Sequence, residues 1–138
     1  MASTEQSLID TDVLSAIMRT HPVAIAQAKK YLSVYRQLSF SIITKYEVLR
    51  GLKVKGSTTQ ISTFDHLCKK SQILLLTDEI ISKAAEIYAD LYKRGELISD
   101  ADILISASAI SNGLTLVTNN EKHFGRIAGL RLENWLKI

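Results

Sequence analysis

Short apolar runs alternate with long amphipathic segments along most of this 138-residue chain. The short runs have the length of buried strands, whereas the long segments carry apolar residues at the spacing of a helix. Strands that alternate with helices are joined by crossover connections, so neighbouring strands run parallel. The pattern therefore predicts an α/β fold, with helices on both faces of a central, mostly parallel sheet of four to five strands.

The expected elements follow from this periodicity and from turn residues. The expected strands cover residues 7–9, 38–43, 72–76, 114–118 and 130–132. The expected helices cover residues 11–19, 21–35, 44–55, 57–70, 78–94 and 100–112, with a short helix or turn at 120–127. The 78–94 helix carries more apolar surface than one buried face needs. The surplus suits either a protein contact or further core burial.

Composition gives a broad class. Hydrophobic residues make up 46% and charged residues 22% of the chain, as in an ordinary soluble protein. No composition break divides the sequence, so we expect one domain over residues 1–138. Residues 1–6 lack the features of a secretory signal, and no apolar run is long enough to span a membrane. The single cysteine, Cys68, has no internal disulfide partner, which favours a cytoplasmic location. We expect its side chain to be a small buried hydrophobe.

Polar side chains collect where the expected strands end. Asp10 follows the first strand directly, Glu47 lies in the first turn after the second, and Asn120 lies just past the fourth. Asp102 opens the helix that leads into the fourth strand. Ligands in open α/β sheets bind outside the carboxyl ends of the strands. We therefore expect these four positions to lie close together.

Three carboxylates in one pocket repel one another, and a divalent cation relieves that repulsion. Hard ions such as Mg²⁺ prefer oxygen ligands, and a bound ion can polarise a phosphoryl oxygen and lower the pKa of a water. We predict that Asp10, Glu47 and Asp102 hold Mg²⁺ or Mn²⁺ and that Asn120 completes the catalytic set. The accessory candidates are Asp12, Thr11, Thr118 and Glu121. The three histidines, His21, His66 and His123, are scattered and are expected on the surface or in packing.

Helix capping is the alternative interpretation of the same residues. Residues 44–47, 99–102 and 118–121 each fit a capping box, and Asp10 suits the N-cap of the next helix. Carboxylates at helix N-termini are also favoured by the helix dipole, by about 0.3–1 kcal/mol each. The local patterns alone leave both interpretations open.

Four segments, in order, resemble the motifs of PIN domains. They are LIDTDVLS at residues 8–15, SIITKYEVLRG at 41–51, DILISASA at 102–109 and LVTNNEKHF at 116–124. The closing segment, residues 130–135, is also similar to the ends of such chains. The resemblance covers nearly the whole sequence, and size and closing segment most resemble VapC-type toxins of bacterial toxin–antitoxin pairs. It implies the three-layer α/β/α PIN-like fold.

The resemblance also implies an activity and partners: a Mg²⁺- or Mn²⁺-dependent endoribonuclease, a homodimer, and a small antitoxin that blocks the site. Asp10 and Asp102 would ligate the metal, and Glu47 would ligate it through water or orient the attacking water. Asn120 stands where many relatives carry a fourth acid, which puts a second tightly bound metal in doubt. Glu121, if turned inward, or Asp12 would restore that charge.

Basic residues provide candidate RNA contacts. The formal charge is +3, and phosphate contacts are assigned to Lys45, Arg50, Lys53 and Lys122, with a solvated helix face as the alternative. Two other functions remain open. One is a non-catalytic PIN-like module that binds RNA or a partner. The other is a phosphatase of the haloacid-dehalogenase type, because residues 10–12 read D-x-D.

Overall fold

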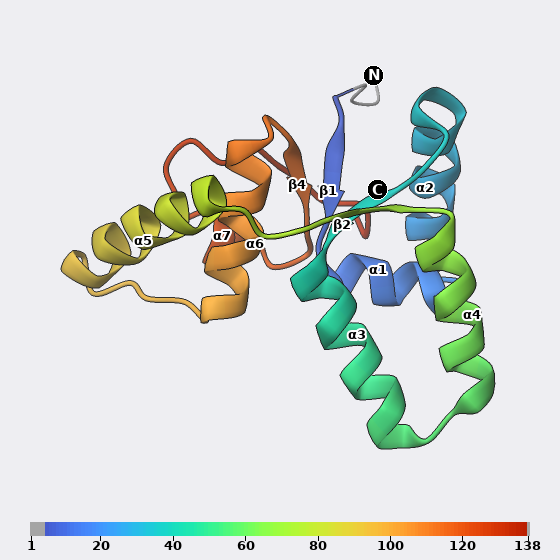
Figure 1. Cartoon of the computed structure of the whole chain (residues 1–138). Helices are drawn as coiled ribbons and strands as arrows, with labels where there is room; N and C mark the ends of the chain where they lie inside the picture. Colours follow the sequence, from blue (N-terminus) through green and yellow to red (C-terminus); the bar gives the residue numbers. More distant parts are fainter. Residues whose placement is uncertain (1–4, 138) are drawn as a thin grey trace.

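The computed structural model describes residues 5–137 (Figure 1). Residues 1–4, on which part of the expectation about a secretory signal rests, lie outside the described residues, as does residue 138. The strands are β1 (Ser7–Ile9), β2 (Ser39–Ser41), β3 (Gln72–Leu74), β4 (Thr115–Val117) and β5 (Leu132–Glu133). The helices are α1 (Thr11–Met18), α2 (Pro22–Tyr35), α3 (Ile42–Lys55), α4 (Thr58–Lys69), α5 (Asp78–Lys93), α6 (Asp100–Ser111) and α7 (Glu121–Phe124).

All strand pairs are parallel, as the alternation of strands and helices predicts. Strands β1, β4 and β5 form one hydrogen-bonded sheet in that order, and β2 pairs with β3 in a second. Strands β1 and β2 lie side by side at the centre of the molecule (Figure 1). The predicted three-layer α/β/α architecture is therefore confirmed, with the five strands divided between two hydrogen-bonded sheets.

Alternate side chains of the central strands point into different hydrophobic clusters. Ile9 and Val117 belong to one cluster, whereas their neighbours Leu8 and Leu116 belong to the other. Successive residues of a strand face opposite sides of a sheet, and both sides here are covered by helices. This double coverage explains why β1 and β4 are apolar in consecutive positions rather than in alternate ones.

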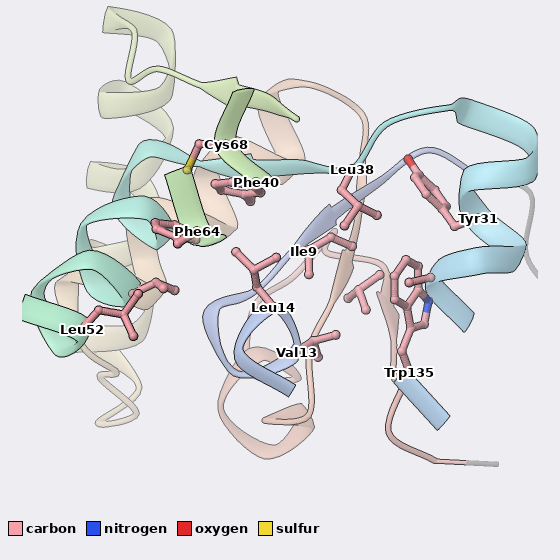
Figure 2. Close-up of a cluster of buried hydrophobic side chains, with 13 residues drawn as sticks. Ile9, Val13, Leu14, Tyr31, Leu38, Phe40, Leu52, Phe64, Cys68 and Trp135 are labelled. Atoms are coloured by element: carbon pink, nitrogen blue, oxygen red, sulfur yellow. The ribbon is translucent and has the colours of Figure 1, made fainter. Parts of the chain in front are cut away.

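Helices α1 to α4 cover one face of the strands. Their cluster contains Phe40 and Phe64, whose ring centroids lie 6.3 Å apart, and Tyr31 against Trp135 at 5.5 Å (Figure 2). Cys68 is buried in the same cluster, as predicted. This cluster packs the start of α1 against α3 and so supports the two helices that carry Thr11 and Glu47.

Helices α5 and α6 cover the opposite face (Figure 1). Half of the residues of α6 are buried and only Asp100 is exposed, in line with the burial expected for a helix that is apolar nearly all round. Helix α5 buries one stripe, Ile80, Ala84, Ile87 and Leu91. A second stripe remains exposed and contains Ile81, Tyr88 and Tyr92. Part of the predicted apolar surplus of this helix therefore faces solvent.

Several element boundaries differ from the prediction by one to three residues, among them those of β2, α3 and β5. Strand β2 ends at Ser41, and α3 begins at Ile42 rather than at residue 44, because the Ser41 side chain caps the helix by accepting a hydrogen bond from the Ile43 N–H (3.0 Å). Strand β5 begins at Leu132 rather than at residue 130 and is only two residues long. Over residues 5–137, no helix is both long enough and apolar enough to cross a membrane.

Candidate active site

The pairing of β1 with β4 places Asp10 beside Thr118. The register joins Ile9 to Val117, so the residues that follow these strands are also neighbours. The Thr118 hydroxyl donates a hydrogen bond to Asp10 Oδ2 (2.7 Å), and the Thr11 N–H donates to Asp10 Oδ1 (2.8 Å). Asp10 is also the N-cap of α1 and is only 5% exposed. In this one conformation Asp10 can therefore both cap α1 and belong to the acidic site.

Burial makes the negative charge of Asp10 unfavourable. Burial first, and the nearby carboxylate of Asp12 second, raise the pKa of Asp10 from 3.8 to about 8, against the lowering effect of the Thr118 hydrogen bond. A carboxyl with such a pKa carries a proton at neutral pH unless a positive charge approaches it. This position therefore favours a cation as a partner.

Asp12 connects α1 to the loop after β4. Its Oδ1 accepts a hydrogen bond from the Val13 N–H (2.7 Å), and its Oδ2 accepts one from the Asn119 N–H (3.1 Å). Asp12 lies in the first turn of the helix and also raises the pKa of Asp10. The Asp12 side chain therefore lies both at the start of α1 and close to Asp10.

Glu47 is held by side chains from two helices. The Thr11 hydroxyl donates a hydrogen bond to Glu47 Oε1 (2.7 Å) and lies 3.2 Å from the buried Thr44 hydroxyl, with which it forms a second hydrogen bond. Arg50 Nη2 lies 3.7 Å from Glu47 Oε2. The capping interpretation of residues 44–47 is wrong, because Ser41 is the N-cap and Glu47 lies inside the helix.

Asp102 approaches the same edge from α6. The Ser99 hydroxyl caps that helix by accepting a hydrogen bond from the Asp102 N–H (3.2 Å), so this capping prediction is confirmed for the serine. Burial raises the pKa of the Asp102 carboxyl; the Ser99 hydrogen bond and His123 lower it, and the carboxylates of Glu47 and Asp12 raise it. These mutual effects place Asp102 within electrostatic reach of acids from α1 and α3.

Asn120 and His123 form the remaining side of the site. The Asn120 N–H donates to the Thr118 hydroxyl (3.0 Å), and its side-chain nitrogen lies 2.9 Å from His123 Nδ1. His123 Nδ1 also lies 3.9 Å from Asp102 Oδ2. The sequence interpretation placed this histidine on the surface or in packing. The three-residue spacing between Asn120 and His123 could have identified this histidine as a site residue. Thr44 could likewise have been identified, because it lies one helical turn before Glu47.

Other candidates lie away from these acids. The Glu121 carboxylate accepts hydrogen bonds from Lys137 (2.7 Å) and Asn134 (3.0 Å), so it joins the C-terminal segment rather than the acidic cluster. Lys45 and Lys53 line a groove against α4, whereas Lys122 is exposed on α7.

The carboxylate oxygens of the site are ligands that a hard divalent ion prefers. They do not point toward one common position in this structure. Within residues 5–137, no three or more His, Cys, Asp or Glu side chains lie together as a ready coordination set. Asp10 is bound to Thr11 and Thr118, and Glu47 to Thr11 and Arg50, so Thr11 links two of the acids. Asp10 and Asp102 offer oxygen ligands whose pKa values are raised by burial, and Glu47 adds a third carboxylate. This donor set fits Mg²⁺ or Mn²⁺ after side-chain rotation.

Comparisons with known proteins agree with this architecture. The family model described as PIN domain matches residues 7–130. The chain is 30% identical over 131 residues to Ribonuclease VapC2 of Rickettsia felis, covering 94% of this chain and 98% of that protein. It is 34% identical over 120 residues to Ribonuclease VapC1 of Methanocaldococcus jannaschii, covering 87% and 79%.

Solved structures share the fold. A chain of VapBC-1 from nontypeable Haemophilus influenzae matches with a TM-score of 0.82 and 28% identity, covering 95% of this chain and 98% of that one. VapBC-5 from Mycobacterium tuberculosis, described as a member of the VapBC family of toxin–antitoxin systems, shares the fold at a TM-score of 0.66 and 18% identity, covering 94% and 97%. Because the PIN domain model spans residues 7–130 and VapC proteins align along nearly their whole length, the chain belongs to the PIN domain family and resembles its VapC-type members.

Proposed function

We propose that this protein is a metal-dependent endoribonuclease and the toxin of a toxin–antitoxin pair. The observation that carries the proposal is the buried Asp10 carboxyl, whose pKa is raised to about 8 among other acids at the carboxyl edge of the sheet. Relatives at 30% and 34% identity are named ribonucleases, which supports RNA as the substrate. The expected reaction is hydrolysis of a phosphodiester bond.

In this mechanism Asp10 and Asp102 would hold Mg²⁺ or Mn²⁺, and Glu47 would hold it through water or orient the attacking water. The ion, when bound, supplies positive charge for the phosphoryl oxygens and lowers the pKa of a water. Thr118 keeps Asp10 oriented through its hydroxyl, and Thr11 does the same for Glu47. Glu47 orients the attacking water and takes up its proton, and Asn120 donates a hydrogen bond to the phosphate or to a bound water.

RNA is held by basic side chains near this edge. Arg50 lies beside Glu47 and over the ring of the exposed Tyr46, 5.0 Å from its centroid, so it can reach a phosphate next to the scissile bond. Lys45, Lys53 and Lys122 would contact flanking phosphates. Such contacts position the backbone without reading sequence.

The proposed partners are a small antitoxin and a second copy of this chain, in the cytoplasm. One structural relative is described as a member of the VapBC family of toxin–antitoxin systems, which supports an antitoxin as a partner. The exposed stripe of α5 would form part of the homodimer interface: the Tyr88 and Tyr92 rings stack 6.1 Å apart beside Ile81. Aromatic side chains are enriched in protein interfaces.

One observation favours a second candidate, the non-catalytic PIN-like module that binds RNA. The position of the fourth acid is an asparagine paired with His123, so the site carries one negative charge less. The phosphatase alternative is not retained, because both oxygens of Asp10 are hydrogen-bonded and the side chain is almost fully buried, which suits a ligand better than an exposed nucleophile.

The decisive experiment compares two aspartates of one helix. Purified wild-type protein should cleave RNA in Mg²⁺ or Mn²⁺ and stop in EDTA, and Asp102→Asn should reduce cleavage at least about 100-fold. Asp100→Asn is the matched control, because Asp100 is exposed two residues earlier. Circular dichroism checks that each variant is folded. RNA binding without cleavage under every metal condition would favour the non-catalytic module instead.

A further inference from the structure

A cavity of about 330 Å³ opens directly beside Glu47 and Thr11. It lies between α1, α3 and the start of α4, where α1 and α3 pack close together (Figure 1). Its volume is near the lower end of the ~300–1,000 Å³ range of small-molecule pockets, which suits a group of the size of one nucleoside. None of the roles assigned above uses this space.

Two helix faces line the cavity with a series of residues at four-residue intervals. The series on α3 is Glu47, Gly51 and Lys55, and the series on α1 is Thr11 and Ser15, followed by Arg19 at the helix end. Each series begins at the acidic site and ends at a cation. Because α-helices rise 1.5 Å per residue, Lys55 lies about 12 Å along α3 from Glu47.

Gly51 keeps the cavity open. It lies in the middle of α3, where glycine is less stable than alanine by about 0.5–1 kcal/mol. Its φ is not positive, and a Cβ built there meets nothing within 4 Å, so neither backbone conformation nor helix packing requires a glycine. What the missing side chain provides is space next to Glu47.

The walls suit the parts of a nucleotide. Met18, Val48 and Leu52 supply apolar surface on which a base can lie. Gln60 lines the cavity from α4, and its amide can donate to and accept from the edge of a base. Arg19 and Lys55 supply positive charge for a phosphate. A nucleotide combines an apolar face, a polar edge and an anionic group.

We propose that this cavity binds one nucleotide of the RNA substrate, next to the bond that is cut, and so sets the sequence preference. The proposal rests on the proposed ribonuclease function. The scissile phosphate lies at the acids, the neighbouring base enters the cavity with its edge at Gln60, and the next phosphate lies between Arg19 and Lys55. Single-stranded RNA is recognised by such splayed-out bases, whereas a base inside a duplex would not reach the cavity.

Nucleotide binding tests the cavity without any cleavage. The 5′- and 3′-monophosphates of adenosine, guanosine, cytidine and uridine are titrated into ¹⁵N-labelled protein in EDTA and followed by NMR. We expect saturable shifts confined to amides around Gly51, Ser15 and Gln60, with one base preferred. Gly51→Trp fills the cavity and should weaken binding of the preferred nucleotide about 10-fold or more, the scale of base stacking in single-strand binders.

The matched control is a second tryptophan on the same helix outside the cavity. Val54 is 88% exposed and does not line the cavity, so Val54→Trp should leave nucleotide binding unchanged. In cleavage of a randomised single-stranded RNA, Gln60→Ala should change the base that is preferred beside the cut. A merely structural role of Gln60 would change the rate or stability without changing that preference.

Three results would overturn the proposal. One is the absence of localised shifts at millimolar nucleotide, and another is equal binding by Gly51→Trp and Val54→Trp. The third is a Gly51→Trp protein that keeps nucleotide binding but no longer forms a complex with its co-expressed antitoxin, which would assign the cavity to a protein segment. If the wild type binds a nucleotide in the cavity but cuts no RNA, the ribonuclease proposal fails while the binding site stands.

Discussion

Replacement of Asp10 by asparagine should stabilise the metal-free protein at neutral pH and above. Below pH 3.8 the Asp10 carboxyl is protonated in both the folded and the unfolded chain. Between 3.8 and about 8 the unfolded chain loses this proton while the folded protein keeps it, since the folded pKa is about 8. The folded state then binds more protons, so the free energy of unfolding falls as pH rises through this window.

The size of the effect follows from the shift. Each unit of pKa difference corresponds to 1.36 kcal/mol, so a rise from 3.8 to about 8 lowers the free energy of unfolding by roughly 4 kcal/mol at pH 7 compared with pH below 4. That is a large part of the ~5–15 kcal/mol typical of a domain. Asparagine has nearly the same shape as the protonated carboxyl and removes this pH dependence.

Urea unfolding in EDTA at pH 5.5, 7 and 8.5 measures the effect, with fluorescence of the buried Trp135 as the probe. The advantage of Asp10→Asn over wild type should grow with pH. Asp65→Asn, an exposed acid on α4, is the control and should follow wild type. Saturating Mg²⁺ should stabilise wild type more than Asp10→Asn at pH 8.5. A wild-type stability that rises with pH, or parallel pH curves for wild type and Asp10→Asn, would refute the reasoning.

Three further outcomes test neighbouring features. Thr118→Val removes the hydroxyl that donates to Asp10 and accepts from the Asn120 N–H, so urea unfolding should show a loss of about 1–3 kcal/mol, and the pKa of Asp10 should rise further in an NMR titration. Gly51→Ala should raise the free energy of unfolding by about 0.5–1 kcal/mol, because the new Cβ meets no atom; destabilisation in thermal melts would contradict this. Asn120→Asp adds a carboxylate to the cluster and should tighten Mn²⁺ binding in calorimetry; an unchanged affinity would argue against its place in the metal site.

The parallel pairing of the strands was predictable from the alternation of short apolar runs with long amphipathic segments. Asp10 follows an apolar run that is buried on both faces, and parallel pairing brings its end to the end of β4. The start of α3 was not predictable, because Ser41 and Thr44 are both good caps three residues apart. Buried Thr44 hydrogen-bonds Thr11, a contact across two helices that favours the earlier cap and that local spacing does not contain.

Side-chain partners were harder to predict than positions. Glu121 matches a capping box in sequence, yet its carboxylate binds Lys137, sixteen residues later. His123 belongs to the fourth motif, and its contact with Asp102 depends on how α7 and α6 meet. Contacts of this kind arise from tertiary packing, so a single sequence gives the candidates but not their pairing.

The division of the strands between two hydrogen-bonded sheets has a mechanical consequence. Asp10 and Asp102 belong to the half that contains β1 and β4, whereas Glu47 follows β2 in the other half. Backbone ladders resist shear within each half, whereas side-chain packing and side-chain hydrogen bonds such as that from Thr11 to Glu47 resist it between the halves. An ion shared by acids from both halves would restrain this sliding, so amide hydrogen exchange in β2 and β3 should slow when Mg²⁺ is added.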